Sequence, residues 1–170
     1  FEQVAPRLTT LHRPGAEGVP FFFLRVDPAG NVSKRLDGAG FPFAAHGGGG
    51  PPGDRRNSFR NPGKILTQWL ELPGGERFFS IARTVTTGGH GWGEAKALHA
   101  VALACAAEHA PRLAYAAGTD PKLAEATPIG VTCRLCSRAG CAARALPPID
   151  RDIMADDQRR SPAPYAFADG

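Results

Sequence analysis

Residues 64–85 read KILTQWLELPGGERFFSIARTV, and this stretch decides the fold that the sequence predicts. Apolar and polar side chains alternate over 64–72, a Pro-Gly-Gly-Glu turn follows at 73–76, and a second β-prone run occupies 77–85. Two such runs joined by a short turn are typical of an antiparallel hairpin. We therefore expect two adjacent strands of a sheet near the middle of the chain.

A second hairpin is predicted upstream of the first. Residues 19–26 read VPFFFLRV, residues 27–30 form a turn with Asp, Pro and Gly, and residues 31–36 are another β-prone run. A short helix is predicted over 3–12, because its apolar side chains fall on one side. Between the hairpins, residues 47–53 form a low-complexity loop of Gly and Pro.

The alanine-rich stretch 94–109 is predicted to be a helix that Pro111 stops. Four of its side chains fall at i, i+3, i+4 and i+7 and would share one apolar face: Leu98, Val101, Ala102 and Cys105. This pattern would turn the Cys105 side chain inward. Residues 112–117 are predicted to form the last strand.

The predicted order of helix, hairpin, loop, hairpin, helix and strand indicates an α+β fold, with an antiparallel sheet covered by helices. Small-molecule sensor domains of the GAF and PAS kind have this architecture. We expect a ligand-sensing domain over 1–126, a cysteine-rich metal-cluster segment over 127–150 packed on the helix 94–109, and an extended tail over 151–170.

The composition limits the class of protein. The 170 residues carry a net charge of +4 with dispersed basic side chains, which suits a phosphate-bearing small ligand as well as nucleic acid. No apolar run approaches the ~20 residues of a membrane span, and the N-terminus has no signal-peptide pattern. We expect a cytoplasmic protein with no membrane partner and, because the chain lacks an initiator Met, a piece of a larger one.

Three of the four cysteines form a C-x2-C-x4-C cluster of Cys133, Cys136 and Cys141. Three neighbouring thiols cannot pair evenly as disulfides, and thiolates at this spacing converge on a metal at little loop-closure cost. Cys105 is the remaining cysteine, and His109, on the same predicted helix face, competes with it as the fourth ligand. The chain has four cysteines, the number of thiolates that a four-iron cluster usually needs, and this favours an iron–sulfur cluster. The spacing does not exclude zinc.

Several long motifs give the chain a family resemblance. They are FEQV at 1–4 with RLTTL at 7–11, VPFFFLRVDPAGNVSKR at 19–35, NPGKILTQ at 61–68, FFSIARTV at 78–85 and TPIGVTCRLCSRAGCAARALPP at 127–148. Together they resemble the short-chain fatty acyl transcriptional regulators, and the resemblance covers nearly the whole chain.

The resemblance implies the C-terminal sensor part of a bacterial regulator of propionate, acetate or related acyl metabolism. DNA would be bound by a separate helix-turn-helix domain outside this chain, and a homodimer or higher homo-oligomer is expected. The resemblance also implies that coenzyme A or a short-chain acyl-CoA is the ligand. It further implies a [4Fe–4S] cluster on Cys105, Cys133, Cys136 and Cys141.

The chain departs from the family pattern at two places. Family members often carry a Cys-Pro-x-Trp stretch where residues 50–53 read GPPG here. The segment after the last cysteine, usually Pro-Gln-Arg-Ala-Phe, reads AARAL at 142–146. Neither change removes an expected cluster ligand.

The phosphates of coenzyme A need cations or free backbone N–H groups. The glycines of 88–93 lead into the predicted helix at Glu94, and a helix N-terminus behind glycines attracts anions. The alternative for residues 88–93 is an ordinary turn with a glycine cap. The alternative for the cationic side chains on the predicted strands is that they only increase solubility. The residues we assign to the ligand are Lys34, Arg35, Lys64, Arg83, Gly91, Gly93 and Lys96.

No catalytic constellation is visible in the sequence, which has neither a Ser-His-Asp pattern nor an H-E-x-x-H motif. We therefore predict that the chain is not an enzyme. The competing hypothesis is a zinc-stabilised protein-interaction module without a small ligand. Direct nucleic-acid binding by the cysteine loop is less favoured, because residues 133–141 contain no aromatic side chain for stacking on bases.

Overall fold

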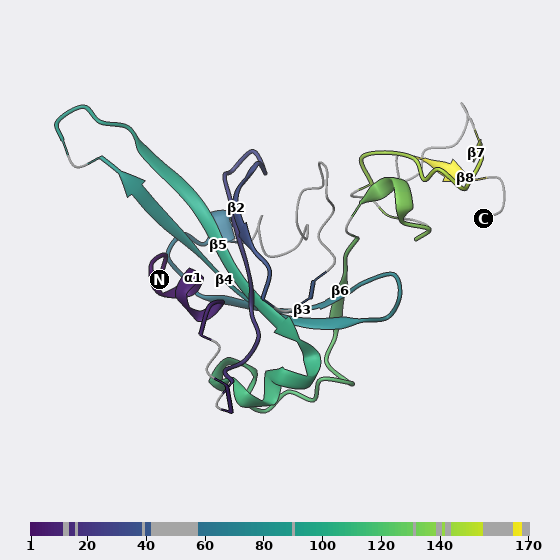
Figure 1. The fold of residues 1–170 in the computed structure, drawn as a ribbon. Coiled ribbons are helices and arrows are strands. Elements are labelled where there is room, and N and C mark those ends of the chain that lie inside the picture. The colour runs from purple at the N-terminus through teal and green to yellow at the C-terminus, as the bar shows by residue number, and fades with distance from the viewer. Residues whose placement is uncertain are drawn as a thin grey trace.

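The structure of the chain is a computed structural model that describes residues 1–11, 14–15, 17–38, 40–41, 58–89, 91–130, 132–138, 141, 144–154 and 165–167. The low-complexity loop at 47–53 lies outside these residues. The described part is a mixed α+β fold dominated by one sheet, as Figure 1 shows. The α+β class expected from the sequence is therefore confirmed in its coarse form.

Six strands form the main sheet in the order β2-β1-β5-β4-β3-β6. All neighbouring pairs are antiparallel except β3 and β6, which run parallel. The strands are β1 (Phe22–Val26), β2 (Val32–Leu36), β3 (Leu66–Glu71), β4 (Arg77–Gly88), β5 (Lys96–Ala106) and β6 (Ala126–Pro128).

Both predicted hairpins are confirmed. β1 pairs with β2, and β3 pairs with β4 from Leu66 opposite Ala82 to Glu71 opposite Arg77. The turn between β3 and β4 closes because Gly75 adopts a φ of 89°, a conformation that residues with a Cβ rarely enter. The short helix α1 (Val4–Leu8) covers only part of the helix predicted over 3–12.

The helix predicted over 94–109 is wrong. Residues 96–106 form β5, which pairs with β4 from Lys96 to Ala106, and the 3-10 helix η1 (Ala107–Arg112) follows it. The strand predicted over 112–117 is wrong as well, because η1 runs into a second 3-10 helix, η2 (Ala114–Ala116). The cysteine segment therefore has no helix 94–109 to pack on, and no helix begins at Glu94.

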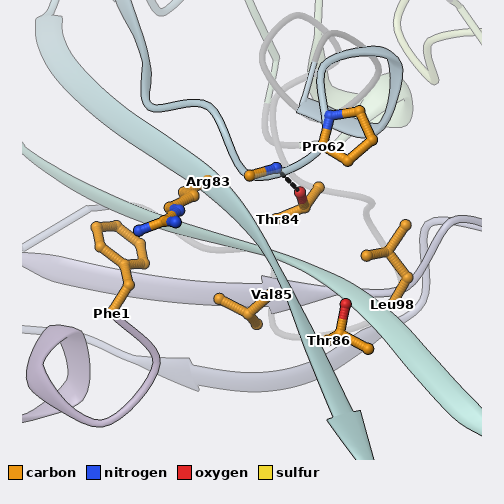
Figure 2. A pocket seen from close by; sticks show the side chains of 8 residues that line it. Phe1, Pro62, Arg83, Thr84, Val85, Thr86 and Leu98 are labelled. Carbon is orange, nitrogen blue, oxygen red and sulfur yellow. Dashed lines mark hydrogen bonds between the residues drawn. The ribbon is translucent and has the colours of Figure 1, made fainter.

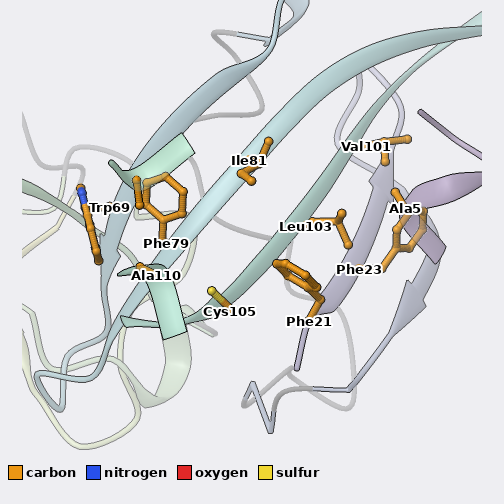
Figure 3. Close-up of a cluster of buried hydrophobic side chains, with 11 residues drawn as sticks. Ala5, Phe21, Phe23, Trp69, Phe79, Ile81, Val101, Leu103, Cys105 and Ala110 are labelled. Carbon is orange, nitrogen blue, oxygen red and sulfur yellow. The ribbon is translucent and has the colours of Figure 1, made fainter. Parts of the chain in front are cut away.

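Apolar side chains are buried on both faces of the sheet. The larger cluster, shown in Figure 3, lies on the face that carries Phe23, Phe79, Val101, Leu103 and Cys105, and α1, η1 and η2 cover it. Adjacent strand residues point to opposite faces, so the other face carries Phe22, Phe78 and Ala104, which pack with Phe41 and Ile129.

The C-terminal part of the chain leaves the sheet after β6. Its described residues include a short 3-10 helix, η3 (Cys133–Leu135), and a small two-stranded sheet of β7 (Ile153–Met154) and β8 (Ala166–Phe167). These elements lie together at one end of the molecule in Figure 1, away from the tip of the β4–β5 hairpin. Among the described residues, no helix has the length and apolar character that crossing a bilayer requires.

Candidate functional site

The cysteine segment, residues 132–138 with Cys141 and 144–146, is organised by one buried arginine. The guanidinium of Arg144 donates to the carbonyl of Cys133 at 3.0 Å, of Cys136 at 2.9 Å and of Arg138 at 2.6 Å. Only 5% of Arg144 is exposed, and its guanidinium carbon lies 5.3 Å from the ring centre of Phe167. A planar cation with several donors thus holds the loop in place of regular secondary structure.

The individual thiols of this segment have different surroundings. The Cys136 side chain is buried against Gly130, where an added Cβ would lie 3.3 Å from its Sγ. The Cys133 Sγ accepts a long hydrogen bond from the N–H of Ala145 at 3.4 Å. Cys133 and Cys141 are half-buried, and no disulfide joins any of the four cysteines.

Cys105 lies elsewhere in the molecule. It is fully buried near the end of β5, opposite Phe79, in the cluster that η1 covers (Figure 3). Burial raises the pKa of its thiol to about 12, so it is protonated at neutral pH. Cys136 adjoins Gly130, which follows Ile129, a member of the cluster on the opposite face of the sheet.

The structure does not bring the four expected cluster ligands together. In the described part of the chain, which includes all four cysteines, no three Cys, His, Asp or Glu side chains are gathered as a metal site would need. Cys105 lies in the buried cluster on one face of the sheet, whereas Cys136 adjoins Gly130, which follows a member of the cluster on the other face. His109 lies beside Glu108, with 3.4 Å between the ring nitrogen and a carboxylate oxygen. The assignment of all four thiolates to one cluster therefore stays a prediction.

The seven residues expected to contact coenzyme A lie at three separate places. Lys34 and Arg35 are exposed on the edge strand β2. Lys64 lies just before the start of β3, and Arg83 lies in the middle of β4, next to the residue that pairs with Leu66. Gly91, Gly93 and Lys96 lie at the tip of the β4–β5 hairpin, so they do not flank a helix N-terminus.

One hollow lies beside Arg83. Its volume is about 470 Å³, and the lining residues are Phe1, Pro62, Gly63, Arg83, Thr84, Val85, Thr86 and Leu98. Figure 2 shows Arg83 reaching toward Phe1, with Pro62 on the other side and the N–H of Gly63 bonded to the Thr84 hydroxyl at 2.7 Å. The Arg83 guanidinium forms no hydrogen bond or ion pair with any residue that the structure describes.

Two side chains stand out that the sequence reasoning did not assign. Trp92 at the hairpin tip is fully exposed, at 106% of its reference area. The sequence signal for this exposure was an aromatic residue between two glycines. Arg144 is the second, in the segment after the last cysteine. Its carbonyl contacts have no sequence signature, because they depend on how the loop closes.

A family model described as "Short-chain fatty acyl coenzyme A regulator, C-terminal" matches residues 10–165. The chain is 42% identical, over 99% of its length, to the "Propionyl-CoA carboxylase regulator" of Cereibacter sphaeroides. It is 43% identical over 97% of its length to "HTH-type transcriptional regulator RamB" and 37% identical over 98% to "HTH-type transcriptional regulator PrpR", both of Mycobacterium tuberculosis.

The solved structure of a "Mycobacterium tuberculosis transcriptional regulator" is similar over 98% of this chain and 51% of the other, with a TM-score of 0.86 and 36% identity. The chain spans about a third of the length of the curated relatives, from 34% to 36%. The likeness therefore concerns one part of those regulators.

Proposed function

The chain belongs to the short-chain fatty acyl coenzyme A regulator family, and from this membership we propose that it is the ligand-sensing regulatory domain of a cytoplasmic transcriptional regulator of short-chain acyl metabolism. The observation that carries the proposal is the family match over residues 10–165, which spans both the sheet and the cysteine segment. The resemblance stated from the sequence is confirmed by this match. The relatives are regulators and not enzymes, so the prediction that the chain is not an enzyme is confirmed as well.

The ligand we propose is coenzyme A or a short-chain acyl-CoA. The matched family is described by this class of molecule, and one relative is described as regulating a propionyl-CoA enzyme. The phosphates would be met by cations among the residues assigned above, and Arg83 is the first to test, since its guanidinium has no partner among the described residues and borders a hollow. Ligand binding would shift the domain between two arrangements, and the size of the shift is limited by the difference in affinity for them.

Calorimetry with coenzyme A and propionyl-CoA tests this function. Three variants divide the assigned cations by place: Lys34→Gln with Arg35→Gln, Lys64→Gln with Arg83→Gln, and Lys96→Gln. We expect wild-type binding, and a loss of about tenfold or more in affinity in the variant whose cations meet the phosphates. Absence of heat and of any thermal shift in the wild type would contradict the proposal and favour the interaction module.

We propose further that a [4Fe–4S] cluster, or zinc in its place, is held by Cys133, Cys136 and Cys141. The spacing of these cysteines within one short segment supports it. Cys105 was the expected fourth ligand, but its buried position in the core argues for a ligand other than Cys105.

Metal analysis after anaerobic purification tests the cluster. We expect iron and sulfide in the wild type and in Cys105→Ala, and their loss in Cys136→Ala. Loss of iron in Cys105→Ala, with the sheet still folded by circular dichroism, would restore Cys105 as a ligand. Zinc alone in the wild type would reject the iron–sulfur cluster and support the zinc alternative.

The finer architecture and the DNA partner are part of the same proposal. Five antiparallel strands with side chains buried on both faces support a GAF- or PAS-like sensor, although the expected long covering helix is a strand here. Two of the relatives are named as HTH-type regulators, which supports DNA binding through a separate domain.

A further inference from the structure

Cys133 and Cys136 lie at the two ends of one tight turn. Residues Cys133–Leu135 form the 3-10 helix η3, and the N–H of Cys136 closes it by donating to the carbonyl of Cys133 at 3.3 Å. In 3-10 geometry, residues i and i+3 lie on the same side and about 6 Å apart along the axis. A disulfide joins residues whose Cα atoms are about 4.4–6.8 Å apart. The turn therefore holds these two cysteines at a separation that a disulfide can bridge.

The other two cysteines are held at different places. Cys105 is fully buried in the cluster that η1 covers. Cys141 begins a separate turn, in which its carbonyl accepts from the N–H of Arg144 at 3.1 Å. A disulfide to Cys141 would have to join two turns instead of the ends of one, and it would order a longer stretch of chain. The backbone thus preorganises the pair of Cys133 and Cys136.

The thiols of this pair differ in their access to solvent. Cys133 is half-buried, and its Sγ accepts a hydrogen bond from the N–H of Ala145 at 3.4 Å. Only 8% of Cys136 is exposed. A small oxidant therefore reaches Cys133 first, and Cys136 is the thiol that resolves the oxidised sulfur. An accessible cysteine next to a resolving one is typical of reversible oxidation sites.

We propose that Cys133 and Cys136 form a reversible dithiol–disulfide site, which hydrogen peroxide or a related hydroperoxide oxidises in the metal-free protein. The O–O bond of the peroxide breaks, one oxygen passes to the Cys133 sulfur as a sulfenic acid, and water leaves. The Cys136 sulfur then displaces the hydroxyl as a second water, and the S–S bond forms. Two thiols thus lose two electrons and two protons, and one peroxide is reduced to two waters.

The disulfide excludes a metal from the cysteine segment, because a sulfur in an S–S bond cannot supply the thiolate that a metal binds. This consequence rests on the proposed metal site. The disulfide itself needs neither a metal nor coenzyme A, so it can be tested without them. Oxidation then keeps the segment free of metal until a thiol reductant opens the disulfide.

Peroxide treatment of the reduced, metal-free protein tests the site. Thiols are counted in denaturant, and disulfides are located by peptide mass mapping. We expect the four thiols of the chain to fall to two, with a disulfide between Cys133 and Cys136 of the same chain. Dithiothreitol should restore all four. Four thiols that survive peroxide, a disulfide to Cys141, or a disulfide between two chains would overturn the proposal.

Three variants separate the roles of the thiols. Cys141→Ala removes the other half-buried thiol and should form the same disulfide at the wild-type rate. In that background, Cys136→Ala should stop at the Cys133 sulfenic acid, which dimedone traps. In the same background, Cys133→Ala should react with peroxide at least about tenfold more slowly, since buried Cys136 reacts only when its surroundings open. Loss of the disulfide in Cys141→Ala, or no sulfenic acid in the Cys136→Ala variant, would contradict these roles.

Zinc alone tests the consequence for metal binding. The reduced protein should bind Zn²⁺, and the oxidised protein should bind it at least about 100-fold more weakly in competition with a chelator. Equal affinity of the two forms would show that the disulfide does not exclude the metal. If the reduced protein binds no zinc while the disulfide still forms, the zinc alternative of the proposed function fails and the disulfide site stands.

Discussion

At the scale of single residues, Arg144 decides the shape of the cysteine segment. Its three short contacts all end on backbone carbonyls of a segment that has little regular pairing, and the Cys133 carbonyl also accepts from the N–H of Cys136. A lysine at this position would keep the charge but would lack the planar fork that reaches several carbonyls at once. The positions of Cys133 and Cys136 therefore depend on Arg144 even without a metal.

Arg144→Met should loosen this loop while leaving the sheet intact. Since hydrogen bonds to a charged group are worth about 1.5–3 kcal/mol each, we expect amide exchange over residues 133–138 to accelerate by about 100-fold. Arg144→Lys should give an intermediate rate. Arg134→Met is the matched control, because Arg134 is in the same segment with an exposed side chain. Equal exchange in the Met variant and the wild type would show that the loop is held by other contacts.

The buried Cys105 thiol gives the protein a defined alkaline response. Its pKa is raised to about 12 by burial, above the value near 9 of an unfolded thiol, so the folded state keeps a proton that the unfolded state loses. The stability from this neutral thiol is complete below pH 9 and declines as the pH rises toward 12. Relative to Cys105→Ala, the free energy of unfolding of the wild type should fall by about 1.4 kcal/mol per pH unit above 9.

Urea unfolding of both proteins between about pH 8 and pH 10.5 measures this decline, and the tyrosines and lysines shared by both proteins cancel in the difference. At pH 8, iodoacetamide should modify Cys133 and Cys141 in the metal-free folded protein but not Cys105. A difference between wild type and variant that does not change with pH would place the Cys105 thiol in contact with water.

At the scale of elements, β5 shows where sequence reasoning succeeded and where it failed. The hairpins were predictable because their turns and alternating runs are local signals. β5 was predicted as a helix because alanine is the best helix former, and four apolar residues matched helical spacing. The side chains of β5 alternate in size. Val101, Leu103 and Cys105 lie in the cluster on one face, while Ala104 and Ala100 lie in two smaller clusters on the other face.

The small side chains of β5 have a packing role that composition alone cannot reveal. Above Ala104, the rings of Phe22, Phe41 and Phe78 pack on one another with centres 4.2 to 6.0 Å apart. A larger residue at this position would displace them. Pairing with β1 on one side and β4 on the other then outweighs the helical preference of alanine.

Ala104→Leu should therefore destabilise the fold by about 1–3 kcal/mol through overpacking against these rings. Ala97→Leu makes the same chemical change on an exposed part of β5 and should alter stability by no more than about 0.5 kcal/mol. The midpoint of urea unfolding measures both. A neutral or stabilising Ala104→Leu, the result expected on an exposed helix surface, would contradict the strand assignment of β5.

The candidate site was less predictable than the strands. The sequence indicated which cysteines share a segment, since spacing is local, but His109 competed with Cys105 as the fourth ligand only through the helix expected over 94–109. Replacing that helix by a strand leaves Cys105 buried, as expected, but takes His109 off its face and moves Gly91 and Gly93 to a hairpin tip. A single error in one element therefore removed both the helix on which the cysteine segment was expected to pack and the helix N-terminus expected to bind phosphates.

At the scale of the whole molecule, the sheet and the C-terminal part are joined by few contacts. β6 pairs with β3, and the carbonyl of Glu71 accepts from the N–H of Ile129 at 2.9 Å and from Arg138 at 3.3 Å. Within the described residues, the buried apolar clusters on the sheet contain no member after Ile129. The elements beyond it depend on Arg144 and Arg151, whose guanidinium carbons lie 5.3 and 4.4 Å from the ring centre of Phe167.

This arrangement predicts two units of unequal stability. In metal-free protein, amides over residues 132–154 should exchange through local opening at low denaturant, while β1, β3, β4 and β5 exchange only with global unfolding. The denaturant dependence of exchange should be smaller for the C-terminal part, because its opening exposes less surface. Hydrogen exchange measured by mass spectrometry at increasing urea distinguishes the two. If both parts exchanged with one free energy and one slope, the C-terminal part would be an integral piece of the sheet domain, and loss of a metal there would unfold the whole chain.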